Sequence, residues 1–128
     1  MTNQKSKILI IFLFLIFITN SKLLAQDDNK LVTLTKQIVE TKQNVDTYLA
    51  FEELTDLYFK ENKYNEFAKL LNSLANQKKA LEPVVNYYIG FTRYYQLKYL
   101  EESQNWDEYF SQGNTYKEQL VSSLQEAI

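Results

Sequence analysis

The sequence predicts an all-α protein, because apolar residues recur at the three- and four-residue spacing of helices along almost all of the chain after residue 29. The alternation of apolar and polar residues that is typical of half-buried strands is absent from the sequence. Among 128 residues there are only two glycines and one proline, so few positions interrupt a helix. These observations predict one leading helix followed by two antiparallel helical hairpins.

The N-terminal segment, residues 1–25, predicts a secretory signal peptide. A polar, lysine-containing start leads into an uninterrupted apolar run from Ile8 to Ile18, and Ala25 offers a small residue at the cleavage point. Eleven helical residues span roughly 16 Å, about half of the hydrocarbon core of a membrane, which is short for a spanning helix. We therefore expect residues 1–25 to be the signal peptide and residues 26–128 to be the mature domain.

The leader also predicts where the protein acts. An exported domain is expected to be periplasmic or extracellular. The alternative is a leader that stays uncleaved and anchors the domain in the inner membrane. The lysine- and isoleucine-rich composition of the leader is typical of bacteria.

The first two expected helices cover about residues 30–43 and about residues 47–61. The first carries Leu34 and Ile38 on its apolar face, and Asp46 is the expected N-cap of the second, because its carboxylate can accept from free backbone amides. The apolar face of the first helix is also predicted to include Leu31 and either Thr41 or Val45. The apolar face of the second helix is predicted to comprise Phe51, Leu54, Leu57 and Tyr58.

The third and fourth helices are expected over about residues 64–77 and 83–102. Pro83 suits the first position of the fourth helix, where its missing N–H would have no partner in any case. The fourth helix is apolar or aromatic on most sides, which predicts a central position in the fold. The third helix is expected to bury Phe67, Leu70, Leu71 and Leu74.

The fifth helix is expected to begin near Trp106, with Gly113 as a weak point inside it. We expect this helix to leave an apolar edge exposed, which makes self-association through the C-terminal helix possible. A further reading is that residues 26–128 form the first part of a longer repeat array. The apolar positions of the fifth helix are Trp106, Tyr109, Phe110, Tyr116, Leu120 and Leu124.

The turns before the third and fifth helices have the same sequence pattern. Each consists of an aromatic residue, Asn or Asp, Glu and a second aromatic residue, beginning at Tyr64 in one turn and at Trp106 in the other. The pattern indicates an internal repeat of two helical hairpins.

These hairpins resemble the tetratricopeptide repeat family over about residues 47–120. The resemblance rests on the spacing of Phe51, Leu54, Tyr58 and Tyr64, and on the stretch Tyr87-Tyr88-Ile89-Gly90, which is similar to the first helix of that repeat. Leu54 and Ile89 are then equivalent, and their separation is close to the usual period of about 34.

The chain departs from the family at positions that affect helix packing. Phe67 and Tyr109 stand where the repeat has a small alanine, so each hairpin is expected to splay or to place a small residue opposite. Gly90 stands where the repeat has a close contact between helices.

The resemblance implies a scaffold that binds a peptide segment or protein partner in the groove lined by the first helix of each hairpin. The predicted partner-binding residues are Phe59, Tyr87, Phe91, Tyr94 and Tyr95. Tyrosine suits recognition because it offers a large contact area and a hydroxyl group with few rotatable bonds. Carried over by position, the groove also includes Leu49, Glu52, Asp56, Lys60 and Val84.

Two other readings of the aromatic residues remain open. They form part of the core, or they line an internal pocket for a small apolar molecule, in which case the protein is a ligand-holding domain. Exposed rings in an open groove favour the scaffold, and a closed aromatic cavity favours the pocket.

Composition excludes several classes of function. Without cysteine or histidine there is no thiol nucleophile, no disulfide, no thiolate or imidazole metal site and no Ser-His-Asp triad. Residues 26–128 hold 11 basic and 16 acidic groups, a net charge of −5 that is unfavourable for binding nucleic acid. We therefore expect no enzymatic activity, no cofactor and no nucleic-acid partner.

Overall fold

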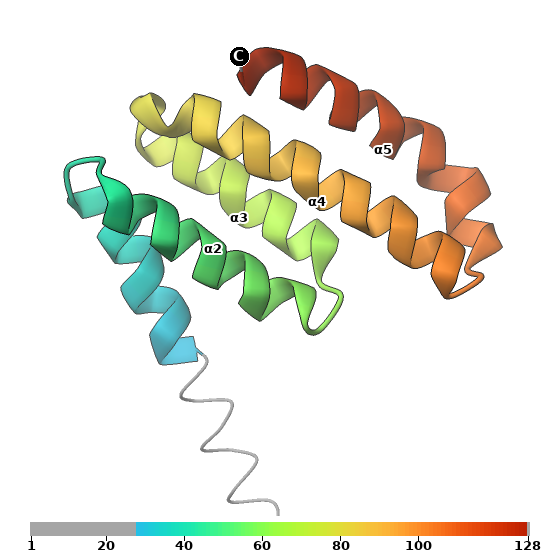
Figure 1. Cartoon of the computed structure of the whole chain (residues 1–128), viewed down its shortest axis with the longest axis horizontal. Coiled ribbons are helices and arrows are strands. Elements are labelled where there is room, and N and C mark those ends of the chain that lie inside the picture. Colours follow the sequence, from blue (N-terminus) through green and yellow to red (C-terminus); the bar gives the residue numbers. More distant parts are fainter. Residues whose placement is uncertain (1–27, 128) are drawn as a thin grey trace, which may run out of the picture.

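The computed structural model describes residues 28–127, and over that range the chain is helical without strands. A leading helix over residues 28–40 precedes four helices that alternate in direction (Figure 1). The prediction of an all-α protein is confirmed, whereas the predicted signal peptide lies outside the described residues. The four helices are α2 (Val45–Phe59), α3 (Tyr64–Gln77), α4 (Glu82–Glu102) and α5 (Trp106–Ala127).

Helix α2 begins two residues earlier than predicted, because its N-cap is Asn44 and not Asp46. The Asn44 side-chain oxygen accepts from the Thr47 amide at 3.2 Å, and the Thr47 hydroxyl accepts from the Asn44 amide at 3.2 Å. This reciprocal pair is a capping box. Asp46 lies in the first turn instead, where a negative charge interacts favourably with the helix dipole.

The turns after α2 and α4 have the same backbone geometry. The Lys63 amide donates to the Tyr58 carbonyl at 3.0 Å, and at the equivalent place in the second turn the Asn105 amide donates to the Leu100 carbonyl at 2.9 Å. In each turn one residue has a left-handed backbone, Asn62 in the first and its equivalent at position 104 in the second. Together these features form the Schellman motif that ends a helix and reverses the chain.

Helix α4 is entered through a single 3-10 turn, Lys79–Leu81. The helix starts at Glu82, one residue before the predicted start, and Pro83 occupies the first turn, where no amide partner is required. Leu81 is completely buried and ties this entry to the core.

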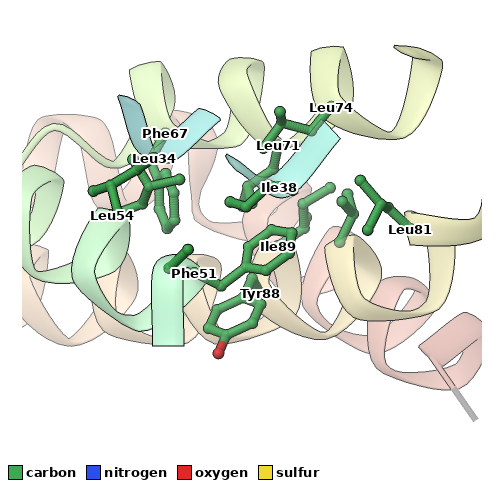
Figure 2. Close-up of a cluster of buried hydrophobic side chains, with 12 residues drawn as sticks. Leu34, Ile38, Phe51, Leu54, Phe67, Leu71, Leu74, Leu81, Tyr88 and Ile89 are labelled. Atoms are coloured by element: carbon green, nitrogen blue, oxygen red, sulfur yellow. The ribbon is translucent and has the colours of Figure 1, made fainter. Parts of the chain in front are cut away.

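The main core lies among the leading helix, α2, α3 and α4 (Figure 2). Phe51 stacks on Tyr88 with ring centroids 5.1 Å apart, and Leu34 and Ile38 bring the leading helix against the same cluster. Helical spacing therefore predicted this core well. Its buried members are Leu34, Ile38, Ala50, Phe51, Leu54, Phe67, Leu71, Leu74, Leu81, Val85, Tyr88 and Ile89.

Helix α4 is central, as predicted, with α3 on one side and α5 on another. Gly90 permits the close approach of α5, because a Cβ atom there would lie only 2.7 Å from Leu124 Cδ2. Helix α5 continues through Gly113, where a Cβ atom would lie 3.9 Å from Leu97 Cδ2, so the weak point expected there does not interrupt the helix.

Several apolar residues of the predicted helical faces are exposed. On α5 only Tyr116 of the predicted set is buried, while Trp106, Phe110 and Leu124 are exposed, and on α2 Val45 is exposed. The expected apolar edge of α5 is therefore present. No helix within residues 28–127 is both long and apolar enough to cross a membrane.

Candidate interaction surface

The five aromatic residues predicted to bind a partner form one connected set of ring contacts, which we call the aromatic face: Phe59, Tyr87, Phe91, Tyr94 and Tyr95. At its centre, Phe59 from the end of α2 meets two rings of α4. The Phe59 ring stacks with Phe91 at 6.1 Å and contacts Tyr95 at 5.6 Å, and Phe91 and Tyr95 are 4.6 Å apart.

The remaining two rings extend the aromatic face along α4. Tyr87 stacks with Phe91 at 6.1 Å, and Tyr94 meets Tyr95 edge-on at 5.3 Å. Residues four apart on a helix lie above one another, which explains why Tyr87, Phe91 and Tyr95 form a continuous row. Tyr87 is 48% exposed and Tyr94 is 52% exposed, while the other three rings are half-buried.

The aromatic face is connected to the hydrophobic core through Phe59. Phe59 packs edge-on against Phe67, which is completely buried, with centroids 6.0 Å apart. Phe67 in turn stacks on Tyr58 at 5.1 Å. These bulky rings lie between α2 and α3, so the neighbours of Phe67 are aromatic and not the small residue that was one of the two expectations.

A hydrogen bond joins α2 to α4 beside the aromatic face. The Tyr88 hydroxyl donates to a carboxylate oxygen of Glu52 at 2.5 Å. Burial and this hydrogen bond raise the pKa of Tyr88 well above its usual value, because both favour the protonated phenol. Glu52, which was assigned to the groove by position, therefore holds the two helices together.

Two apolar grooves border the aromatic face. One, of about 290 Å³, lies between α4 and α5 and includes Gly90 in its lining. The other, of about 620 Å³, extends toward the start of α2. Tyr87 and Leu124 line both grooves, so the two are adjacent. The other lining residues are Phe91, Tyr94 and Leu120 in the first, and Tyr48, Pro83, Val84, Tyr88 and Ala127 in the second.

Sequence reasoning missed the contributions of Tyr48 and of the last turns of α5. Leu120 and Leu124 were predicted only as apolar positions of the fifth helix, and in the structure they form walls of the groove between α4 and α5. No local pattern pointed to this role, because it depends on where α5 lies against α4. Of the residues assigned by position, Val84, Tyr87, Phe91 and Tyr94 line a groove, and Leu49 is exposed on α2.

The described part of the chain has no group of three or more acidic, cysteine or histidine side chains close enough together to hold a metal ion. The comparisons with known proteins add no family. No family model, no curated protein and no solved structure matches the chain.

Proposed function

We propose that this domain is a non-enzymatic interaction module of the tetratricopeptide-repeat type, which binds a peptide segment or protein partner on its aromatic face. One observation carries the proposal: a connected set of rings, with Tyr87 and Tyr94 about half exposed, borders two apolar grooves. Exposed apolar surface next to a groove is typical of protein-binding sites. Tyrosine is enriched among the residues that dominate binding energy at such sites.

The arrangement of the hairpins supports the repeat assignment in this proposal. The two interhelical turns share a hydrogen bond and a left-handed residue at equivalent positions. The first helices of the two hairpins, α2 and α4, both contribute rings to the aromatic face. A solenoid fragment with a leading helix is consistent with both observations.

The composition of the leader supports export. In this proposal the domain acts in the periplasm or outside a bacterial cell. The alternative is that an uncleaved leader holds it at the inner membrane.

A second candidate function rests on the larger groove. Its volume of about 620 Å³ falls within the range of roughly 300–1,000 Å³ that is usual for small-molecule sites, and its lining is mostly apolar. A small apolar ligand seated against Tyr87 and Val84 would make the protein a ligand-holding domain.

A peptide selection tests the first proposal. Peptides would be selected from a phage-displayed random library on the full chain, and their affinities compared for the native protein and for a variant with Tyr87→Ala and Tyr94→Ala. Because a central aromatic contact contributes about 1–2 kcal/mol, the double variant should lose about tenfold or more in affinity. Phe110→Ala, which removes an exposed ring of α5 outside the aromatic face, should leave affinity unchanged.

Two results would count against the interaction module. Equal binding by the native protein and the Tyr87 and Tyr94 variant would show that the aromatic face is not the site. Unfolding of that variant, seen as loss of its circular dichroism signal, would show that these rings belong to the core. Saturable binding of the apolar dye anilinonaphthalene sulfonate that Val84→Glu abolishes, without any selected peptide, would favour the ligand-holding function.

A further inference from the structure

The only arginine of the chain crosslinks three helices. Arg93 lies on α4 and is 9% exposed. Its Nε donates to the Gln119 side chain of α5 at 2.7 Å, and one terminal nitrogen donates at 2.7 Å to both Asn65 of α3 and Gln96 of α4. The guanidinium carbon lies 4.8 Å from the centre of the Tyr116 ring.

All of these partners are neutral, so the charge of Arg93 has no counter-ion among residues 28–127. Over residues 28–127 no carboxylate forms an ion pair with the guanidinium. Burial lowers the pKa of Arg93, since desolvation disfavours the charged form, but an arginine stays protonated at neutral pH. Buried charges are normally paired, and this one is paired only with amide dipoles and an aromatic ring.

A polar cavity opens beside this charge. It has a volume of about 230 Å³, lies among α3, α4 and α5, and is lined by Arg93 with Asn72, Asn86, Ser123 and Glu126. The side chains of Asn72, Asn86 and Ser123 make no hydrogen bond to any other residue of the described range. The second terminal nitrogen of Arg93 likewise has no protein acceptor there. Side-chain N–H and O–H donors without a protein partner in the described range therefore line the same cavity as this positive charge.

We propose that this cavity binds a carboxylate group, held by Arg93 with the donors of Asn72, Asn86 and Ser123. Guanidinium groups form strong, charge-assisted hydrogen bonds with carboxylates. The Glu126 carboxylate at the edge of the cavity adds negative charge, which favours a singly charged anion over doubly charged phosphate. The cavity shares no lining residue with the aromatic face or its grooves, so this site is separate from the one proposed above.

The single arginine makes the site directly observable. A ¹⁵N-labelled sample of the full chain gives one Nε–H resonance, that of Arg93, which would be followed during a titration with sodium acetate. We expect a saturable shift with acetate, a weaker response to phosphate, and none with sodium chloride at equal ionic strength. A response to chloride equal to that of acetate, or no response to either, would overturn the proposal.

Two matched variants test whether the cavity causes the response. Ser123→Asp puts an internal carboxylate into the cavity and should weaken acetate binding at least about tenfold, because the charge of Arg93 is then paired. Ser122→Asp adds the same charge at the neighbouring exposed position and should leave acetate binding within about twofold of the native value. A response that persists in Ser123→Asp, or that both variants lose equally, contradicts the assignment.

A third variant keeps the test decisive if Ser123→Asp does not fold. Glu126→Gln removes an exposed carboxylate at the edge of the cavity and should strengthen acetate binding about threefold. Unchanged or weaker binding would refute the site. Titration with N-acetylalanine identifies the source of the carboxylate: tighter binding than acetate indicates the C-terminus of a peptide, and weaker binding indicates a small free acid.

Discussion

The same substitution at the two glycines is expected to change stability in opposite directions, because the two helix contacts differ in closeness. Alanine at Gly90 puts a methyl group 2.7 Å from Leu124 Cδ2 and 2.8 Å from Leu124 Cγ. Carbon atoms in favourable contact are about 3.5–4.0 Å apart, so atoms must move. Alanine at Gly113 meets its nearest neighbours, on Leu97 and Tyr109, at 3.9 Å, which is ordinary contact.

The magnitudes follow from these distances. Both glycines lie inside helices, where alanine is favoured by about 1 kcal/mol. Nothing opposes this gain at Gly113, so Gly113→Ala should raise the free energy of unfolding by about 0.5–1 kcal/mol. At Gly90 the crowding costs about 1–3 kcal/mol, which leaves a net loss of about 1 kcal/mol. The two variants should therefore differ by about 2 kcal/mol.

Urea unfolding of the full chain, followed by circular dichroism, measures this difference. Repeating Gly90→Ala in a Leu124→Ala background removes the crowded atoms, and the substitution should then be stabilising by about 1 kcal/mol. If Gly90→Ala and Gly113→Ala stabilise the native protein equally, the close approach of α4 and α5 at Gly90 is wrong.

Three further predictions concern the helix cap, the buried phenol and the apolar edge of α5. Asn44→Ala should lower the free energy of unfolding by about 1 kcal/mol in urea titrations, and Asn44→Asp should not, because it keeps the capping oxygen. Since burial and the hydrogen bond to Glu52 raise the pKa of Tyr88 above the unfolded value of 10.0, the folded state holds that proton more tightly, and stability should fall as the pH rises above about 10. Tyr88→Phe should reduce this dependence in urea midpoints measured between neutral and alkaline pH, and identical slopes would contradict the assignment. Phe110, 77% exposed, and Val121 lie three turns apart on α5, so light scattering should show concentration-dependent self-association that Phe110→Glu abolishes, whereas a monomer at every concentration would leave this edge without a partner.

Local patterns were sufficient for much of the fold. The bounds of α3 and the start of α5 were predicted correctly, because each of these helices begins with an aromatic residue directly after a short turn that reverses the chain. The start of α2 was predicted wrongly because Asn44 and Asp46 are both good caps, and the choice depended on Thr47 completing a reciprocal pair.

The candidate site was only partly predictable. Its five aromatic residues were named from helical register and a family resemblance, and their rings are in contact. The sequence did not show which rings are exposed and which are buried. Tyr87 and Tyr88 are adjacent and identical in type, yet Tyr87 is 48% exposed and Tyr88 only 4%. Successive helical residues point about 100° apart, so only the position of α2 against α4 distinguishes them.

By itself, the sequence determined the helical class, the order of the helices and most of the core, because these depend on spacing along the chain. Tertiary structure alone decided that Leu120 and Leu124 line grooves beside Tyr87. It also decided that Arg93 reaches polar partners on α3 and α5, far away along the chain, and forms no ion pair with a carboxylate of residues 28–127. Such relations depend on how closely two helices approach and on their rotation about their axes. Both are set by side chains that meet across the fold, such as Gly90 against Leu124, and no spacing within one helix encodes them.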